Sequence, residues 1–114
     1  IRICDHSKEV EKIKSILVCD ETLYDVAELF KAFADTTRIK IIAVLKEEEL
    51  CVGAISELIN VSQSAVSHQL RVLKNSKIIK PKKVGKQIFY SLDDEHIKPI
   101  FNQCLDHVDG RSEE

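Results

Sequence analysis

The stretch from Val61 to Lys74 limits the fold of this chain most strongly, because it is apolar on one side and polar on the other. Val66, Leu70 and Leu73 recur at i, i+4 and i+7, the spacing that places side chains on one face of a helix. The opposite stripe carries short polar side chains and one arginine, where solvated helices usually carry Glu and Lys. It comprises Ser64, Ser67, His68 and Arg71. Side chains of this kind can reach base edges and phosphates in a DNA major groove.

A basic segment surrounds this predicted helix. Seven of the chain's 17 Lys and Arg residues lie between Ser62 and Tyr90, whereas all 19 Asp and Glu residues lie outside that window. The seven are Arg71, Lys74, Lys77, Lys80, Lys82, Lys83 and Lys86. A local basic segment in a chain of net charge -2 favours a phosphate-backbone partner. A solvated lysine face is the alternative interpretation.

Length and composition indicate a single, mostly helical domain over residues 1–114, with 44% hydrophobic residues, two Pro and three Gly. No apolar run approaches the roughly 20 residues that span a bilayer. No signal peptide is visible, so we expect a cytoplasmic protein, although the absence of Met leaves residues upstream of Ile1 open. The chain has no nucleophile–base constellation and no glycine-rich phosphate loop, so we do not expect an enzyme.

Three helices are predicted ahead of the basic segment, over about residues 7–18, 20–34 and 36–46. Ser7 is expected to cap the first and Asp35 the third, and the second begins at Asp20 or Thr22. Apolar residues at helical spacing are expected to face inward in each. They are Val10, Ile13, Ile16 and Leu17; then Leu23, Val26, Ala27, Phe30 and Phe33; then Ile39, Ile42, Ala43 and Leu45.

A helix-turn-helix is predicted next. A short helix runs from Val52 or Gly53 to Ile59, with Ile55 and Leu58 buried, and residues 60–62 form a tight polar turn. Ser62 caps the following helix, over about residues 62–75, which is the candidate recognition helix.

A β-hairpin follows that helix, over about residues 78–92. Ile78–Lys80 and Gln87–Leu92 have strand composition, and Gly85 marks the turn between them. The tip is basic and is expected to contact the DNA backbone through Lys82, Lys83 and Lys86. The predicted fold is therefore mainly α with a small β-hairpin, a winged helix-turn-helix.

The last predicted helix, over about residues 94–108 with Asp93 or Asp94 as its cap, carries Asp94, His96 and His107. These are ligand types that Zn²⁺ takes. The two histidines are roughly 16 Å apart along one helix, so one ion cannot bind both on one chain. Two antiparallel helices across a two-fold axis would bring Asp94 and His96 of one subunit to His107 of the other. The helix's apolar face would form that interface: Ile97, Ile100, Phe101, Cys104, Leu105 and Val108. The alternative is a helix cap and two solvated histidines.

Three groups of residues resemble one known family. They are residues 33–38 (Phe-Ala-Asp-Thr-Thr-Arg); 49–53 with 62–70; and 90–97 with 105–107. With them the chain resembles the ArsR/SmtB family of bacterial metal-sensing repressors, most closely its zinc, cadmium and cobalt sensors. The resemblance implies a homodimer whose metal-free form binds operator DNA and which Zn(II) or Cd(II) releases, derepressing genes of metal efflux or sequestration. It places Gln63, Ser64, Ser67 and His68 at DNA-contacting positions, and Asp94, His96 and His107 at metal positions.

Two departures from the family pattern concern ligands. The fourth ligand of the last-helix site would fall on Gly110, which has no side chain. A frayed C-terminus that brings Asp109 or Glu113 round, a water, or Cys104 are the alternatives for this position, and Cys104 is otherwise an interface residue. A second site in some relatives would correspond here to Cys4, His6 and Cys51. It is incomplete because Gly53 and Ala54 replace ligands, but a thiolate-rich set of this kind would favour Cd²⁺ or Pb²⁺.

Two other functions stay open at the level of sequence. The four cysteines, at positions 4, 19, 51 and 104, contain no Cys-x-x-Cys pair, and reduced thiols or metal ligands are favoured over a disulfide framework. A thiol-redox repressor would need two of them with Cα atoms within about 7 Å. A winged-helix domain with vestigial ligands that binds DNA or proteins constitutively is the other alternative.

Overall fold

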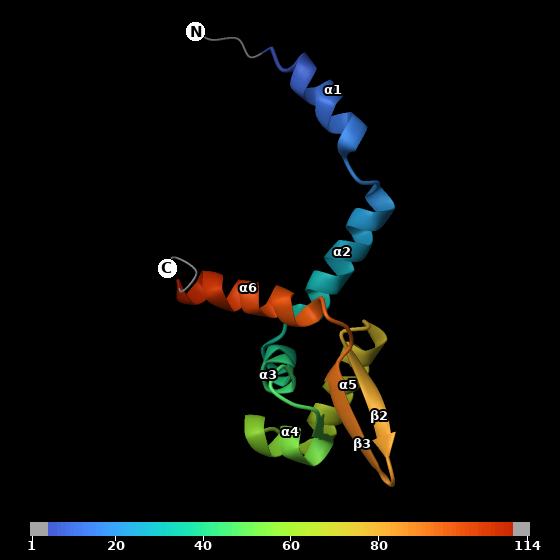
Figure 1. Cartoon of the computed structure of the whole chain (residues 1–114), viewed down its shortest axis with the longest axis vertical. Helices are drawn as coiled ribbons and strands as arrows, with labels where there is room; N and C mark the ends of the chain where they lie inside the picture. Colours follow the sequence, from blue (N-terminus) through green and yellow to red (C-terminus); the bar gives the residue numbers. More distant parts are fainter. Residues whose placement is uncertain (1–4, 111–114) are drawn as a thin grey trace.

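The part of the chain that the structure describes, residues 5–110 of a computed structural model, contains six helices and a small sheet (Figure 1). In chain order the elements are α1 (Ser7–Ile16), α2 (Asp20–Phe33), α3 (Thr36–Leu45), β1 (Leu50–Cys51), α4 (Val52–Ile59), α5 (Gln63–Asn75), β2 (Ile79–Val84), β3 (Gln87–Leu92) and α6 (Ile97–Asp109). The predicted winged helix-turn-helix is confirmed: α4 and α5 form the helix-turn-helix, and β2 and β3 form the wing. No helix within residues 5–110 is long and apolar enough to cross a membrane.

The core lies between α3, α4, α5 and the base of the hairpin, and α6 covers one side of it. The predicted stripe of α5 is confirmed, because Val66, Leu70 and Leu73 are at most 2% exposed. The other buried side chains are Ala32, Ile41, Ile42, Leu45, Ile55, Ile78, Ile79, Ile97 and Phe101. This packing holds α5 by its apolar side and leaves its polar side outward.

Helix caps explain where α3 and α5 begin. Asp35 accepts a hydrogen bond from the backbone N–H of Arg38 at 3.0 Å, and the Ser62 hydroxyl accepts one from Ala65 at 3.2 Å, as the sequence predicted. Asn60 adopts the left-handed conformation that ends α4 and starts the tight turn.

The prediction was wrong at two other helix starts. α1 begins at Ser7, but its cap residue is His6 and it ends at Ile16 rather than near residue 18. α6 begins at Ile97, three residues after Asp94. Asp94 instead accepts a hydrogen bond from the backbone N–H of His96 at 2.8 Å, closing a turn before the helix.

The sheet has three antiparallel strands in the order β1–β3–β2. Sequence analysis missed β1, because two residues are too few to show an alternating pattern; Leu50 pairs with Tyr90. β2 continues to Val84, beyond the predicted end at Lys80, so Lys82 and Lys83 lie in the strand rather than in a loop. Pro81 is tolerated because β2 is an edge strand. Gly85, with φ of 63°, makes the two-residue turn.

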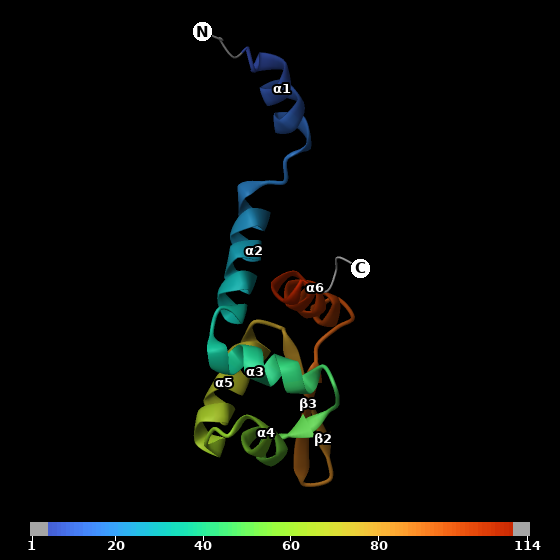
Figure 2. The same ribbon diagram turned by 90° about the vertical axis from the view of Figure 1, so that its left-hand side faces the viewer.

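The apolar faces of α1 and α2 were predicted to be buried, and within the described chain they are not. α1 has no buried residue and α2 buries only Ala32. Leu23 and Phe30, for example, are 43% and 56% exposed. Both helices extend away from the rest of the molecule (Figures 1 and 2). With them included, the molecule measures 67 Å along its longest axis. Others in this exposed set are Val10, Ile13, Ile16, Leu17, Val26 and Ala27; Phe33 is half-buried. Leu58 of α4 is a separate wrong prediction, at 61% exposed.

Candidate nucleic-acid interface and metal centre

The polar face of α5 is fully available to a partner. Every residue predicted from sequence to contact DNA on this helix is exposed: Gln63, Ser64, Ser67, His68 and Arg71. The N-terminal turn carries the first two, and helix N-termini with free backbone N–H groups favour anions such as phosphate. The buried residues on the opposite face fix which side chains point outward.

The wing adds positive charge beside this helix. Lys82, Lys83 and Lys86 are all exposed, and Lys82 Nζ lies 3.9 Å from the carboxylate of Glu49. A hollow separates α5 from the wing. It is lined by Cys51, Val52, Gly53, Ser67, Lys86, Gln87, Ile88 and Tyr90. α5 and the wing therefore form one concave surface with cationic side chains at its edge.

Gly53 lies between Cys51 and the start of α5. A Cβ atom at this position would lie 3.6 Å from Gln63 Nε2 and 4.0 Å from Cys51 Sγ. These are ordinary contacts, so the glycine is not required by space. The half-buried thiol of Cys51 thus lies close to the first residue of α5.

Of the residues predicted for a second metal site, the two that the structure describes, His6 and Cys51, are not brought together within one chain. Cys4 lies outside the described residues. His6 precedes α1, at the opposite end of the molecule from α4, where Cys51 is the cap residue (Figure 1). Any site that joins His6 to Cys51 would need two subunits.

Asp94 and His96 form a pair of donors just before α6. His96 Nδ1 lies 3.6 Å from Asp94 Oδ1, and both side chains are more than half exposed. The backbone N–H of His96 holds the pKa of Asp94 below its usual value, with a smaller contribution from the imidazole, so this carboxylate is ionised at neutral pH.

His107 is exposed in the last turn of α6, at the other end of the helix. Within residues 5–110 no three His, Cys, Asp or Glu side chains are grouped so that they could hold a metal ion. An exposed carboxylate–imidazole pair fits one half of a Zn²⁺-type site by its donor chemistry. The described part of this chain does not supply the other half of such a site.

Fewer apolar residues of α6 face outward than the sequence predicted. Ile97 and Phe101 are buried in the subunit's own core, at 5% and 8% exposed, so they offer little surface to a partner. Cys104 and Val108 are exposed, and Ile100 and Leu105 are half-buried. They border an apolar cavity of about 290 Å³ between α2, α3 and α6, which Phe30, Phe33, Ile39 and Phe101 also line.

The three cysteines that the structure describes are free and lie on separate elements. Cys51 lines the hollow beside the wing, and Cys104 lines the apolar cavity at α6. Cys19, the cap residue of α2, lies 3.3 Å from the hydroxyl of Thr22, and that hydrogen bond lowers the pKa of the thiol. Cys51 and Cys104, the pair that a redox switch would use, line different cavities.

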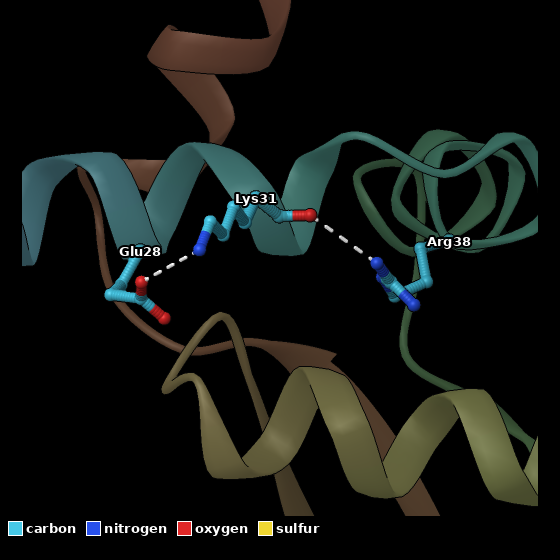
Figure 3. Close-up of polar contacts among 3 residues, drawn as sticks. All are labelled: Glu28, Lys31 and Arg38. Atoms are coloured by element: carbon cyan, nitrogen blue, oxygen red, sulfur yellow. Dashed lines mark hydrogen bonds and ion pairs between the residues drawn. The ribbon is translucent and has the colours of Figure 1, made fainter.

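Sequence analysis missed Arg38 and Gln69. The Arg38 guanidinium donates to the carbonyls of Ala32 and Lys31 at 2.7 and 3.3 Å, and to Gln69 Oε1 at 2.9 Å. Figure 3 shows its contact with the backbone of Lys31, whose own side chain pairs with Glu28. One signal was available: Arg38 lies in the first turn of an apolar helix, where the helix dipole disfavours a cation.

Comparison with known proteins identifies the family. Residues 35–80 match the model described as "Bacterial regulatory protein, arsR family". A transcriptional repressor SmtB homolog of Synechocystis is 34% identical over 110 residues, which cover 93% of this chain and 83% of that protein. The chain belongs to the ArsR family of bacterial regulatory proteins. Like the relatives named as transcriptional repressors, it is a regulator and not an enzyme.

Two other similar proteins extend the comparison. The cadmium resistance transcriptional regulatory protein CadC homolog of Staphylococcus aureus is 44% identical over 103 residues, covering 90% of this chain and 84% of that one. A solved structure from Mycobacterium bovis, titled a homodimeric winged helix-turn-helix DNA-binding domain, has a TM-score of 0.76 at 24% identity. The match covers 86% of this chain and 94% of that chain, and it supports the fold alone.

Proposed function

We propose that this ArsR-family protein is a metal-responsive transcriptional repressor that acts in the cytoplasm as a homodimer. Its metal-free form binds operator DNA, and Zn²⁺, or a related ion such as Cd²⁺ or Co²⁺, releases it and derepresses genes of metal efflux or sequestration. The observation that carries the DNA-binding part is the exposed polar face of α5 beside the cationic wing. α5 is the proposed recognition helix.

Each DNA-contacting residue has a proposed role. The side chains that would read base edges in a major groove are exposed donors and acceptors on the outer face of α5: Gln63, Ser64, Ser67 and His68. Four exposed cations would bind the phosphate backbone without reading sequence: Arg71, Lys82, Lys83 and Lys86.

The homodimer is supported by the uncovered apolar faces of α2 and α6. Leu23, Val26 and Phe30 of α2 face solvent, and Val108 of α6 is 79% exposed. Apolar surface of this extent marks an interaction site. An isologous interface would cover the same faces on both subunits and would set the spacing of the two recognition helices on a palindromic site.

The proposed metal site joins the two subunits. Asp94 and His96 of one subunit would supply two donors, and His107 of the partner subunit would supply a third; Gly110 offers no fourth side chain. When bound, a divalent cation supplies directional bonds between these donors. Because the donors lie at the ends of α6, their position depends on how the subunits are arranged. Metal and DNA that favour different arrangements weaken each other's binding by the same factor.

The relatives' names support a metal as the signal, since one is a cadmium resistance regulator. A site of Cys4, His6 and Cys51 across subunits, with Cd²⁺ or Pb²⁺ as its ion, is the competing location for that signal. It requires α1 of one subunit to reach α4 of the other.

The test measures DNA binding with and without metal. The protein first selects a duplex from a random 30-base-pair pool. Binding to this duplex is then measured by fluorescence anisotropy for three proteins. They are wild type, the α6 variant His96→Ala/His107→Ala and the matched control His6→Ala/Cys51→Ala. We expect Zn²⁺ to release wild type and the control, but not the α6 variant. Release of the α6 variant with retention of the control would move the sensing site to the cysteines. Wild type that holds DNA in Zn²⁺, Cd²⁺ and Co²⁺ would refute metal sensing.

A further inference from the structure

We propose that Arg38 is a positioning residue for DNA recognition, because it ties the recognition helix α5 to the C-terminal end of α2. This inference rests on the proposed DNA-binding function. Its guanidinium donates to two carbonyls of α2 and to the side-chain carbonyl of Gln69 on α5. One planar group therefore bonds to two helices that are separated in the chain by α3, β1 and α4. Figure 3 shows the α2 side of this contact, at the carbonyl of Lys31.

The bonds to α2 are favourable because of where they fall. The last carbonyls of a helix lack intrahelical partners and carry the negative end of the helix dipole. Arg38 donates to two carbonyls of this last turn, that of Ala32 from Nε and that of Lys31 from Nη2; the Lys31 carbonyl also accepts from the backbone N–H of Ala34 at 3.1 Å. The geometry uses the fixed fork of donors that arginine has and lysine lacks. The backbone of Arg38 is itself held by Asp35, so the side chain starts from a fixed point.

The bond to α5 explains why its two glutamines differ. Gln63 is exposed at the start of the helix, whereas Gln69 is half-buried and its carbonyl oxygen accepts from Arg38 Nη1 at 2.9 Å. Hydrogen bonds to a charged donor are stronger than neutral ones. The buried stripe of α5 sets the rotation of the helix, and the bond at Gln69 adds a second fixed point directly after Ser67 and His68.

The same bonds relate the recognition helix to the proposed subunit contact. The face of α2 that carries Leu23, Val26 and Phe30 is the uncovered apolar face, while the C-terminal carbonyls of α2 hold Arg38. A change in how α2 meets the partner subunit would therefore reach α5 through Arg38. Two helices that share one arginine form a physical connection whose coupling can be measured.

The bond is tested first without DNA, by a double-mutant cycle. Arg38→Lys keeps the charge and removes the fork, and Gln69→Ala removes the acceptor while leaving the bonds to α2. We expect the unfolding equilibrium constants, from urea titration, to be non-additive by fivefold or more. If the effects of the two substitutions on the unfolding equilibrium constant combine independently to within twofold, the Arg38–Gln69 bond is refuted. Gln69→Ala alone keeps the test open if Arg38→Lys fails to fold.

The positioning role is tested by specificity. We expect Gln69→Ala to lose about tenfold in affinity for the selected duplex and less than twofold for a scrambled duplex, with Gln103→Ala on α6 unchanged on both. Equal losses on the two duplexes, or none, would overturn the positioning role even if the cycle shows the bond. Wild type that selects no duplex from the pool would instead refute the proposed function, and the positioning role with it.

Discussion

α5 and α2 are amphipathic helices of 13 and 14 residues, yet they are covered in different ways. α5 buries Val66, Leu70 and Leu73 against α3, α4 and β2 of its own chain. α2 buries only Ala32, near the end that packs on α3, and leaves Leu23 and Phe30 in solvent. An apolar stripe therefore shows that a helix needs a covering surface, but it does not show whether the same chain or a partner provides that surface.

The largest effect is expected where α5 meets the core. Leu70→Ala should lower the free energy of unfolding by about 3 kcal/mol, because it leaves a cavity in a packed interior. Urea denaturation measures this loss. The matched control is Leu58→Ala, an exposed leucine of α4, for which we expect a change of less than about 1 kcal/mol. Similar losses at the two leucines would erase the contrast between covered and uncovered apolar residues.

The next effect is expected at α2. Phe30→Ser should raise the dimer dissociation constant by at least about tenfold, since large aromatic side chains at the centre of an interface dominate its affinity. Sedimentation equilibrium reads out the monomer–dimer ratio. Tyr24→Ser, on a neighbouring face of the same helix, serves as the control and should change it little. Dimers of undiminished affinity in the Phe30 variant would mean that another surface joins the subunits.

A smaller effect is expected at the wing, beside the covered helix. Lys82→Ala should weaken binding to all duplexes alike and reduce the slope of log K against log salt by about one, because one phosphate contact is lost. Anisotropy titrations over a range of salt concentrations measure the slope, and Lys98→Ala on α6 is the control. A change in sequence preference with an unchanged slope would contradict the phosphate assignment.

The smallest effect is expected at the start of α2. The hydrogen bond from Thr22 lowers the pKa of Cys19, so at neutral pH its thiolate fraction exceeds that of an ordinary exposed thiol. Thr22→Val should raise this pKa and slow alkylation of Cys19 by iodoacetamide a few-fold, while Cys104 labels at an unchanged rate. Peptide mass spectrometry follows both sites. Identical rates for Cys19 in the two proteins would show that Thr22 does not stabilise the thiolate.

Several elements could be located from sequence because their signals are local. Asp35 and Ser62 mark the starts of α3 and α5, because each caps its helix by accepting a hydrogen bond from the backbone N–H three residues ahead. β1 could not be found in this way, since it exists only through its pairing with β3. The start of α6 was misplaced because a carboxylate that bonds two residues ahead looks in sequence like a helix cap.

The residues of the candidate site also divide into those with a local sequence signal and those that depend on long-range contacts. The exposed residues of α5 were found because helical periodicity separates them from the buried stripe. Arg38 and Gln69 were not, because their hydrogen bond joins residues 31 positions apart and leaves no periodic trace. The residues proposed to bind metal were found by type and spacing, and that spacing alone indicated that one chain cannot complete the site.

The sequence by itself determined the amphipathic helices, the basic segment and hence the winged helix-turn-helix, because these depend on residue type and on spacings within a few turns. Only the tertiary structure decided which apolar stripes the chain covers itself. It also decided that Arg38 joins α2 to the proposed recognition helix. The physical reason is that burial and long-range hydrogen bonds depend on how separate elements pack. An apolar stripe such as that of α2 or α5 can be buried by its own chain or left exposed, and the sequence of the stripe does not decide between the two.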